Sequence, residues 1–313
     1  MDVSVLLATF DRSDMLDGTL QSFTQLDAPG IAFEIIVADN AADDRVRSLV
    51  EGYRERLPIM YVPEPERGKN RAITAALKYA CGSLLVFTDD DVIAAPDWLV
   101  QMWTGAARHP KASLFGGRIL PSFPEGHEAW LRQLDFHHWF IRSAYVMADW
   151  DCGETEVSAD RIWGPNMAVR RSVFDAGLCF DLHIGPGESN YIMGSETEFL
   201  LRAQAAGYVG VYLPQALVHH RIREEQLSEK WLLERAFRMG RGHAKRGVKT
   251  EVSRIAGIPR HLFSTYGVRT LEVWSAAMGL RSGCLRERLE LEMLRGEISQ
   301  HWRMRQAHGG CTA

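Results

Sequence analysis

The stretch LLVFTDDDVIAAPDWL, residues 84–99, decides the fold. It opens with apolar residues of strand character and runs directly into three adjacent carboxylates at positions 89–91. Further on, Pro96 suits the first position of a helix, and Asp97 suits the first helical turn. The three carboxylates precede the cap position of this expected helix, so helix capping does not explain them.

Three further runs rich in Val, Ile and Phe come before this stretch, at residues 3–10, 33–39 and 59–62. Helical periodicity fills the gaps between the runs. Short apolar strands that alternate with helices are typical of a buried parallel sheet with crossover helices. We therefore expect an α/β fold with a Rossmann-like first half.

Ligands of open α/β sheets bind outside the carboxyl ends of the strands, where the carboxylates at 89–91 are expected. Three neighbouring like charges repel one another unless a cation neutralises them, and oxygen ligands select a hard ion such as Mg²⁺ or Mn²⁺. We predict such an ion beside a nucleotide diphosphate. A second strand ends at Asp39 and Asn40, where a carboxylate could accept the imide N3–H of uracil or thymine; an ordinary turn is the alternative.

Length and composition are those of a globular chain. Its 313 residues, 46% of them apolar, suffice for one large domain or for a domain with an appendage. The acidic opening does not resemble a targeting segment, and no apolar run approaches the roughly 20 residues of a membrane span. We expect a cytoplasmic protein. The 5 cysteines form no CxxC pair, which argues for reduced, structural thiols.

Charge is distributed unevenly along the chain. Residues 1–220 carry 18 basic and 30 acidic side chains, whereas residues 221–313 carry 18 and 10. Residues 226–247 have the pattern of an arginine-rich amphipathic helix, and residues 271–280 are apolar. Such a tail could bind an anionic membrane surface or nucleic acid, keep the protein soluble, or pack on the rest of the chain.

Other catalytic motifs are missing from the sequence. The stretch RGKNRA, residues 67–72, lacks the upstream glycine and the Ser or Thr of a P-loop, and no GxGxxG follows an expected strand. There is no GxSxG elbow. Kinases, NTPases and dinucleotide-binding proteins are therefore disfavoured as functional classes.

The motifs within residues 3–245 resemble, in order, those of the family 2 glycosyltransferases, which have the GT-A fold. ATFDR at 8–12 is similar to the family's Thr, aromatic, Asn, Arg signature after the first strand, and FTDDDV at 87–92 is similar to its DXD motif. The segment 68–82 is similar to the family's glycine-led helix, although Ile73 and Thr74 replace the usual Arg-Asn pair.

The resemblance implies roles for individual residues. The residues implied in nucleotide binding are Thr9, Phe10, Arg12, Asp39, Asp89 and Asp90, with Lys69 or Arg71 as substitutes for the diphosphate contact. The implied metal ligands are Asp91, Asp89 and His220, with His219 as the rival of His220. In WGPNMA, residues 163–168, Trp163 and Asn166 are implied in the acceptor pocket, although Trp163 could equally belong to the core.

Two carboxylates in GSETEF, residues 194–199, compete for the role of catalytic base. Residues two apart on a helix point in directions roughly 200° apart, so Glu196 and Glu198 cannot share one face. Ser195 and Glu198 have the spacing of a capping box, which would give Glu198 a structural role. We predict that Glu196, at the place of the family's Asp base, is the base, with Glu198 as the alternative.

The resemblance implies an inverting, metal-dependent glycosyltransferase of polysaccharide or glycan assembly. It would use a UDP- or dTDP-sugar as donor and a glycan or lipid-linked acceptor, but no nucleic acid. Guanine offers Asp39 similar hydrogen-bond donors, so GDP-sugars remain an alternative. Two alternative functions are a sugar-nucleotide nucleotidyltransferase and a non-catalytic nucleotide-binding module. The first would normally carry a glycine-rich loop after its first strand, which this sequence lacks. The second would lack the carboxylates near position 196, which this sequence has.

We expect a catalytic domain over residues 1–225, with a nucleotide-sugar half at 1–95 and an acceptor half at 96–225. A basic helical extension would follow at 226–313. The expected location is cytoplasmic, with peripheral attachment at the inner membrane face as a further hypothesis.

Overall fold

A computed structural model describes residues 1–185, 193–247, 253–278 and 285–309. The chain divides into two compact units, of which the first consists of Met1–Ser189 and Ser195–Arg223 and the second contains Glu224–Ala313. The boundary therefore falls after Arg223, two residues before the one expected from the sequence.

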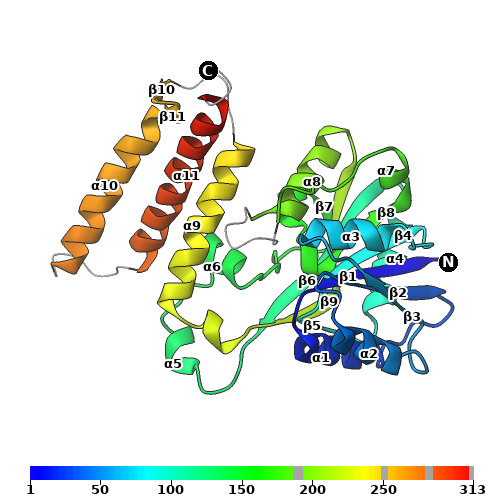
Figure 1. Cartoon of the computed structure of the whole chain (residues 1–313). Helices are drawn as coiled ribbons and strands as arrows, with labels where there is room; N and C mark the ends of the chain where they lie inside the picture. Colours follow the sequence, from blue (N-terminus) through cyan, green and yellow to red (C-terminus); the bar gives the residue numbers. More distant parts are fainter. Residues whose placement is uncertain (186–192, 248–252, 279–284, 310–313) are drawn as a thin grey trace. The chain divides into compact units, whose positions relative to one another are not determined.

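Within the described part of the first unit, nine strands form one mixed sheet (Figure 1). Its order is β3-β2-β1-β4-β8-β6-β9-β5, and β7 pairs with β9. The strands are β1 (Val3–Thr9), β2 (Phe33–Asp39), β3 (Ile59–Pro63), β4 (Leu84–Asp89), β5 (Val92–Ala94), β6 (Ala112–Ser122), β7 (Thr155–Val157), β8 (Met167–Arg170) and β9 (Val209–Arg221). The four expected strands, β1 to β4, are present and mutually parallel where they pair.

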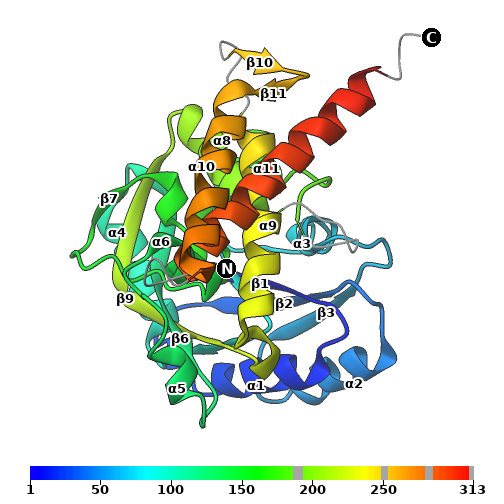
Figure 2. The same ribbon diagram turned by 90° about the vertical axis from the view of Figure 1, so that its left-hand side faces the viewer.

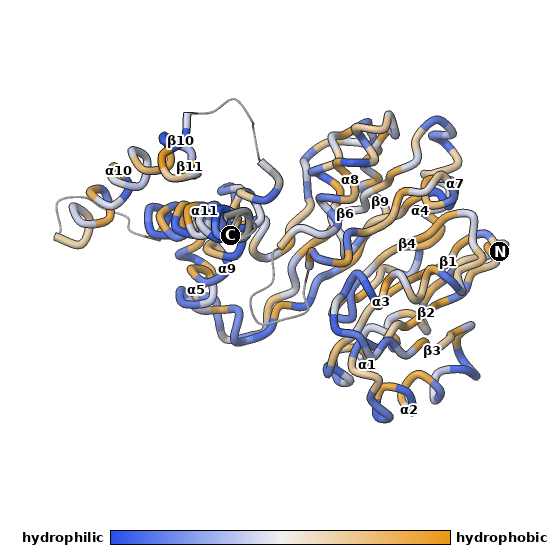
Figure 3. Tube along the Cα trace, turned by 45° about the horizontal axis from the view of Figure 1, so that its top comes forward, coloured by the Kyte–Doolittle hydropathy of each residue, from blue (hydrophilic) through white to orange (hydrophobic). Residues whose placement is uncertain are grey.

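Helices cover both faces of this sheet. One face packs on α1 (Ser13–Phe23), α2 (Asp44–Gly52) and α4 (Trp98–Arg108), and the other on α3 (Lys69–Leu77), α7 (Arg171–Asp175) and α8 (Ser195–Ala205). Figure 2 shows α1 and α2 on one side of the strands and α3 on the other. In β1, Val5 and Leu7 face the first core while Leu6 faces the second. Because both faces are covered, strands such as β1 and β4 are apolar along their length (Figure 3).

The segment after the three carboxylates differs from the expectation. Instead of leading straight to a helix at Pro96, the chain forms the short strand β5, and α4 begins at Trp98. The reason is pairing with a distant segment, because Val92 of β5 lies opposite His220 of β9. This pairing brings the end of β9 to the carboxylates.

Short elements connect β6 to β8 within the first unit. They are the helices α5 (Glu128–Leu131) and α6 (Trp139–Ala144), and the 3₁₀ turns η1 (Ala159–Arg161) and η2 (Gly164–Asn166). The described cysteines, at positions 81, 152 and 179, carry free thiols as expected, and Cys284 and Cys311 lie outside the described residues.

The second unit is helical. It contains η3 (Glu224–Gln226), α9 (Glu229–Arg246), the hairpin of β10 (Arg254–Ile255) and β11 (Ile258–Pro259), α10 (Arg260–Ala277) and α11 (Leu285–Gly309). The apolar side of α9, including Leu232 and Ala236, is buried, so the expected amphipathic helix at 226–247 packs within its own unit. None of the described helices combines the length and the apolarity that a bilayer span requires.

Candidate active site

The carboxyl ends of three parallel strands meet at one edge of the sheet. The register places Thr9 of β1 opposite Asp39 of β2, and Ala8 of β1 opposite Asp89 of β4. Residues implied in nucleotide binding thus converge from segments far apart in the sequence. The three carboxylates at 89–91 lie here, and each has different partners.

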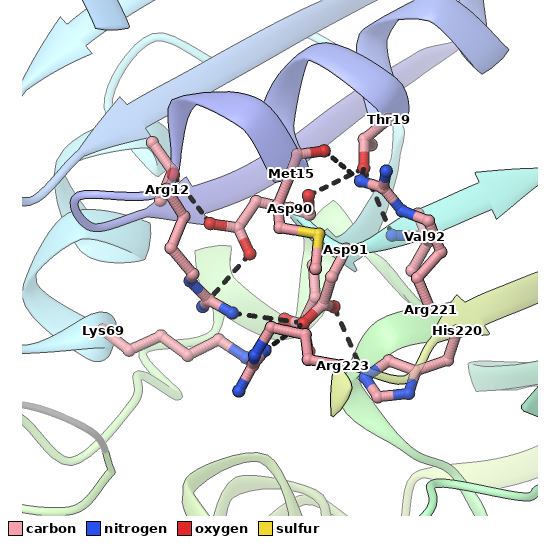
Figure 4. Close-up of polar contacts among 12 residues, drawn as sticks. Arg12, Met15, Thr19, Lys69, Asp90, Asp91, Val92, His220, Arg221 and Arg223 are labelled. Carbon is pink, nitrogen blue, oxygen red and sulfur yellow. Dashed lines mark hydrogen bonds and ion pairs between the residues drawn. The ribbon is translucent and has the colours of Figure 1, made fainter. Parts of the chain in front are cut away.

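Asp90 lies beneath the site rather than on its surface. Its carboxylate is fully buried, accepts a hydrogen bond from the Thr9 hydroxyl at 2.7 Å and lies 3.1 Å from the Arg12 guanidinium (Figure 4). Burial raises the pKa of Asp90 to about 7, against the opposing charge of Arg12 and aided by the charge of Asp91. The expected nucleotide contacts of Asp90 and Thr9 are not available here, because both residues are buried and bonded to each other.

Asp91 lies among three cationic or potentially cationic side chains. His220 Nε2 lies 3.4 Å from its Oδ1, while Arg12 and Arg223 lie 3.2 and 3.5 Å from its Oδ2. Burial by itself raises the pKa of Asp91, but His220, Arg12 and Arg223 outweigh that effect and hold it below the usual value. Asp91 is therefore ionised at neutral pH.

Protein cations thus relieve much of the repulsion that we expected a bound ion to relieve. Two of them, Arg221 and Arg223, were missed by the sequence analysis. Arg221 donates a backbone hydrogen bond to the Asp91 carbonyl, and its guanidinium reaches the Met15 carbonyl (Figure 4). The signal was present in HHRIR, residues 219–223, where basic side chains follow the expected metal-binding histidine.

A divalent ion fits part of this arrangement. No described residue donates a hydrogen bond to the buried Oδ1 of Asp91. Its 3.4 Å separation from His220 Nε2 is close to the roughly 3 Å between adjacent ligands in an octahedron with bonds of about 2.1 Å. Neighbouring residues of a strand point to opposite faces, so His219 is directed away from Asp91.

The expected set of three metal ligands is not assembled, because the Asp89 carboxylate is paired with Lys69. Among the described residues, no three His, Cys, Asp or Glu side chains are arranged to hold an ion. Asp91 and His220 are therefore the two residues that would bind the metal, with water and ligand oxygens completing its shell.

Lys69, the first residue of α3, bridges two carboxylates. Its Nζ lies 2.6 Å from Asp89 Oδ1 and 2.7 Å from Glu196 Oε1, and the Ser195 hydroxyl donates to Glu196 Oε2 at 2.7 Å. Burial alone would raise the pKa of Glu196, but the Lys69 charge outweighs it and holds that pKa below its usual value. Likewise, burial would lower the pKa of Lys69, but Asp89 and Glu196 raise it. Lys69 and Glu196 are therefore both charged.

Glu198 lies away from this cluster, as the helical geometry predicted. Its carboxylate accepts a hydrogen bond from Arg202 at 2.9 Å, whereas the Ser195 hydroxyl bonds to Glu196. The predicted capping box between Ser195 and Glu198 is therefore wrong, because an arginine one turn further along α8 pairs with Glu198. The predicted stop at Gly207 is present, with φ of +94°.

Trp163 directly precedes a glycine that contacts Glu196, but the Trp163 side chain packs against the core on the opposite face of the sheet from α8. The next residue, Gly164, packs so closely on Glu196 that a Cβ there would lie 2.9 Å from its carboxyl carbon. Trp163 is partly exposed, and its ring meets that of Trp150 edge-on at 5.2 Å. This packing is that of a residue at the edge of the core, the alternative named above, and the acceptor contact of Trp163 remains a prediction.

Asn166 has a structural role instead of the expected acceptor contact. It is fully buried, and its amide donates to the carbonyls of Arg118 and Ala216 at 2.9 and 2.7 Å. Its side-chain oxygen accepts a hydrogen bond from the Trp98 indole at 2.8 Å. With these partners in the core, Asn166 cannot reach a ligand.

Asp39 closes the turn after β2. Its fully buried carboxylate accepts hydrogen bonds from the backbone N–H groups of Ala41 and Asp43, and from the Tyr61 hydroxyl at 2.9 Å. The turn that we held as the alternative is therefore formed, and a nucleobase contact would require the turn to open. That contact remains a prediction.

The remaining nucleotide candidates separate into two groups. Phe10 is 38% exposed at the end of β1, with the Arg67 guanidinium 4.9 Å from its ring centre. Arg71 pairs with Glu66 at 2.6 Å and does not join the acidic cluster. Of the two suggested substitutes for the diphosphate contact, the structure brings only Lys69 to the site.

Comparison with known proteins identifies the family of the chain. The family model described as Glycosyl transferase family 2 matches residues 4–177, more than half of the chain. Succinoglycan biosynthesis protein ExoM of Rhizobium meliloti is 29% identical over 78% of this chain and 75% of its own. Glucosyl-dolichyl phosphate glucuronosyltransferase of Haloferax volcanii is 24% identical over 79% and 77%.

Solved structures share the fold. Mannosyltransferase PcManGT of Pyrobaculum calidifontis, in complex with GDP-Man and Mn²⁺, has a TM-score of 0.63 and 17% identity, over 96% of this chain and 87% of its own. TarS 1-349 of S. aureus, in complex with UDP-GlcNAc, has a TM-score of 0.56 and 18% identity, over 81% and 68%. The expected GT-A architecture is thus confirmed, and the chain belongs to glycosyl transferase family 2.

Proposed function

We propose that this glycosyltransferase is inverting and metal-dependent, and that it transfers a sugar from a UDP- or dTDP-sugar to a hydroxyl of a glycan or lipid-linked acceptor. The observation that carries the proposal is the ionised Glu196 carboxylate beside the charged cluster at the strand ends. The relatives support nucleotide-sugar chemistry, since TarS and PcManGT were solved with UDP-GlcNAc and GDP-Man. A GDP-sugar is therefore the alternative donor, and ExoM's role in succinoglycan biosynthesis favours a polysaccharide product.

Glu196 serves as the general base in this proposal. It removes the proton of the acceptor hydroxyl while the acceptor oxygen attacks the anomeric carbon from the face opposite the diphosphate. A single displacement of this kind inverts the anomeric configuration. Ser195, bonded to the second carboxylate oxygen, holds Glu196 in orientation.

Cationic side chains stabilise the departing diphosphate. Arg12 is 40% exposed and Arg223 28% exposed in their side chains, and Lys69 lies on the same side of the acidic cluster. Their positive charges oppose the negative charge that develops on the leaving group. A divalent ion held by Asp91 and His220, Mn²⁺ or Mg²⁺, would supply Lewis-acid stabilisation at the same position.

Substitution of the two glutamates tests the proposal. We expect Glu196→Gln to abolish sugar transfer, by at least about 100-fold, because the amide cannot take the proton. It should retain binding of UDP or dTDP that requires Mn²⁺ and is lost in EDTA. Glu198→Gln is the matched control: it removes only an ion pair with Arg202, should cost about 0.5 kcal/mol and should remain active.

Calorimetry and release of nucleoside diphosphate from a panel of UDP-, dTDP- and GDP-sugars provide the readout. Release should occur only when an acceptor is supplied. Release of pyrophosphate from a nucleoside triphosphate and a sugar 1-phosphate would indicate a nucleotidyltransferase. Nucleotide binding without turnover in the presence of acceptors would indicate a binding module. An active Glu196→Gln with an inactive but folded Glu198→Gln would exchange the two roles.

A second proposal concerns location. An exposed apolar stripe runs along α10. Each of its side chains is 57 to 71% exposed, and they belong to Val268, Leu271, Trp274 and the adjoining Met278. We define these four residues as the α10 stripe. From Glu224 onward the chain carries 16 basic and 10 acidic residues, which complements anionic lipid. The α10 stripe would bring the enzyme to an anionic membrane face, where a lipid-linked acceptor would lie.

A further inference from the structure

We propose that Lys69 is a positioning residue that holds Glu196 inactive until the donor diphosphate draws the lysine away. Donor binding would then prepare the base for the acceptor. The inference rests on the proposed function of Glu196, and it adds a second role for a lysine that would otherwise be only a diphosphate contact.

The resting contacts of Glu196 support this role. Oε1 accepts a hydrogen bond from Lys69 at 2.7 Å, and Oε2 accepts one from Ser195 at 2.7 Å. A general base must present an available oxygen to the hydroxyl that it deprotonates. With an ammonium group on Oε1, the negative charge that would attract the proton is neutralised.

Two described residues bond to the Glu196 carboxylate, and Lys69 is the one that can move away. Ser195 is the adjacent residue in the chain and is 1% exposed. Lys69 has a flexible four-carbon stem, its side chain is 21% exposed, and its ammonium can exchange one anion for another without a fixed geometry. A diphosphate carries more negative charge than either carboxylate that Lys69 bridges.

The surroundings strengthen this competition. Lys69, Asp89 and Glu196 line one small pocket together with apolar side chains, which are Ile73, Phe87, Met167 and Phe180. Charges interact more strongly beside apolar groups than in open water. A diphosphate that approaches Lys69 therefore competes directly with Asp89 and Glu196 for the same ammonium.

The transfer step balances in this scheme. With Lys69 on the diphosphate, the acceptor proton passes to Glu196, and the acceptor oxygen forms its bond to the anomeric carbon. The bond between that carbon and the diphosphate oxygen breaks, and its electron pair leaves with the nucleoside diphosphate. Lys69 then faces the charge that develops, so that one cation restrains the base at rest and assists the leaving group during reaction.

A double-mutant cycle tests the coupling without an acceptor. UDP binding is measured by calorimetry at fixed Mn²⁺ for the wild type, Glu196→Gln, Lys69→Met and the double variant. Glu196→Gln should bind UDP about tenfold more tightly, because Lys69 no longer has to break an ion pair. Lys69→Met should bind more weakly than the wild type, and adding Glu196→Gln to it should change affinity less than about twofold.

Two further variants make the cycle interpretable. Glu198→Gln removes a charge from the same turn of α8, away from Lys69, and should leave UDP affinity unchanged. Lys69→Arg keeps the positive charge, so in that background Glu196→Gln should again tighten binding. This variant also carries the test if Lys69→Met does not fold.

The outcomes separate this inference from the proposed function. The inference is overturned if Glu196→Gln leaves UDP affinity unchanged. It is also overturned if Glu196→Gln tightens UDP binding equally in the Lys69→Met background, since the lost negative charge would then act on UDP directly and not through Lys69. If UDP is not bound, dTDP and GDP replace it in the same cycle. Failure of all three to bind the wild type would overturn the proposed function and this inference together.

Discussion

At the scale of single residues, Gly164 shows how an absent side chain shapes the site. A Cβ on Gly164 would lie 2.9 Å from Cγ, Cδ and Oε1 of Glu196, closer than real contacts of this kind. Its φ is not in the left-handed region, so alanine is tolerated by the backbone and acts only through this clash. The carboxylate would have to move.

We predict that Gly164→Ala lowers kcat at least about tenfold, because displacement of a catalytic group by a fraction of an ångström weakens proton transfer. The unfolding temperature should change little. Gly153→Ala is the control, since a Cβ there meets nothing within 4 Å. Equal activities of the two variants would show that Glu196 tolerates displacement.

At the scale of secondary-structure elements, an ion pair links the end of α4 to the start of β7. Glu154 lies 2.6 Å from Arg108 and 2.7 Å from His109. The hydrogen bond from Arg108 lowers the pKa of Glu154 below its usual value, against the effect of burial and with help from His109. The ionised carboxylate therefore stabilises the fold.

The sign of the pH dependence follows from this lowered pKa. The stabilisation is fully present above the unfolded-state pKa of about 4.3 and is lost as the pH falls through the lower folded-state value. We expect Glu154→Gln to reduce the free energy of unfolding by about 1 kcal/mol at pH 7. In urea titrations that difference should shrink below pH 4. Glu156→Gln, which alters an exposed neighbour on β7, should change the free energy of unfolding at pH 7 by less than about 0.5 kcal/mol.

The contact between α9 and α11 depends on two glycines. A Cβ on Gly240 would lie 1.9 Å from the Met293 carbonyl oxygen, and one on Gly296 would lie 2.0 Å from that of Phe237. Both obstacles are backbone atoms, so neither clash can be relieved by a change of rotamer.

We predict that Gly240→Ala and Gly296→Ala each destabilise the second unit by about 2 kcal/mol, because the helices must separate. Gly267→Ala provides the contrast: it lies inside α10 with nothing within 4 Å of its Cβ position, and should stabilise by up to about 1 kcal/mol. Thermal unfolding followed by circular dichroism distinguishes these results. Stabilisation by all three substitutions would contradict the close contact.

At the scale of the whole molecule, charge and exposed apolar surface are unevenly distributed along the chain. The part after Arg223 combines its excess of basic residues with the α10 stripe, whose Leu271 is 71% exposed. Apolar side chains exposed together on a helix, accompanied by basic residues, are typical of binding in the plane of a membrane.

We expect the full chain to sediment with phosphatidylglycerol vesicles at low salt, and much less with phosphatidylcholine vesicles. The double variant Leu271→Ser/Trp274→Ser should lose most of this binding, because it removes two apolar side chains that are 71% and 67% exposed. Leu182→Ser, which alters a leucine of the first unit that is 39% exposed, should bind as the wild type does. A different result would indicate that the α10 stripe binds a second copy of the chain. In that case the wild type would self-associate without binding vesicles, and the double variant would lose the self-association.

The sequence by itself determined the four parallel strands and the position of the carboxylates at their ends. These features depend on local apolar runs and on the rule that parallel strands present their carboxyl ends at one edge. It also separated Glu196 from Glu198, because the angle between residues two apart on a helix is a local property. The break after Asp91 was missed, since β5 exists through its pairing with β9.

Only the tertiary structure decided which partner each of the three adjacent carboxylates contacts. Asp89, Asp90 and Asp91 are chemically identical, but Asp89 pairs with residue 69, Asp90 with residues 9 and 12, and Asp91 with residues 12, 220 and 223. The same holds for Asn166, whose amide bonds to core groups distant in sequence. Glu198 differs, because the partner that replaced the expected cap is Arg202, only one turn further along α8. Local pattern places a polar group at a strand or helix end; the donors and charges that distant segments bring to it decide whether it binds a ligand or the protein itself.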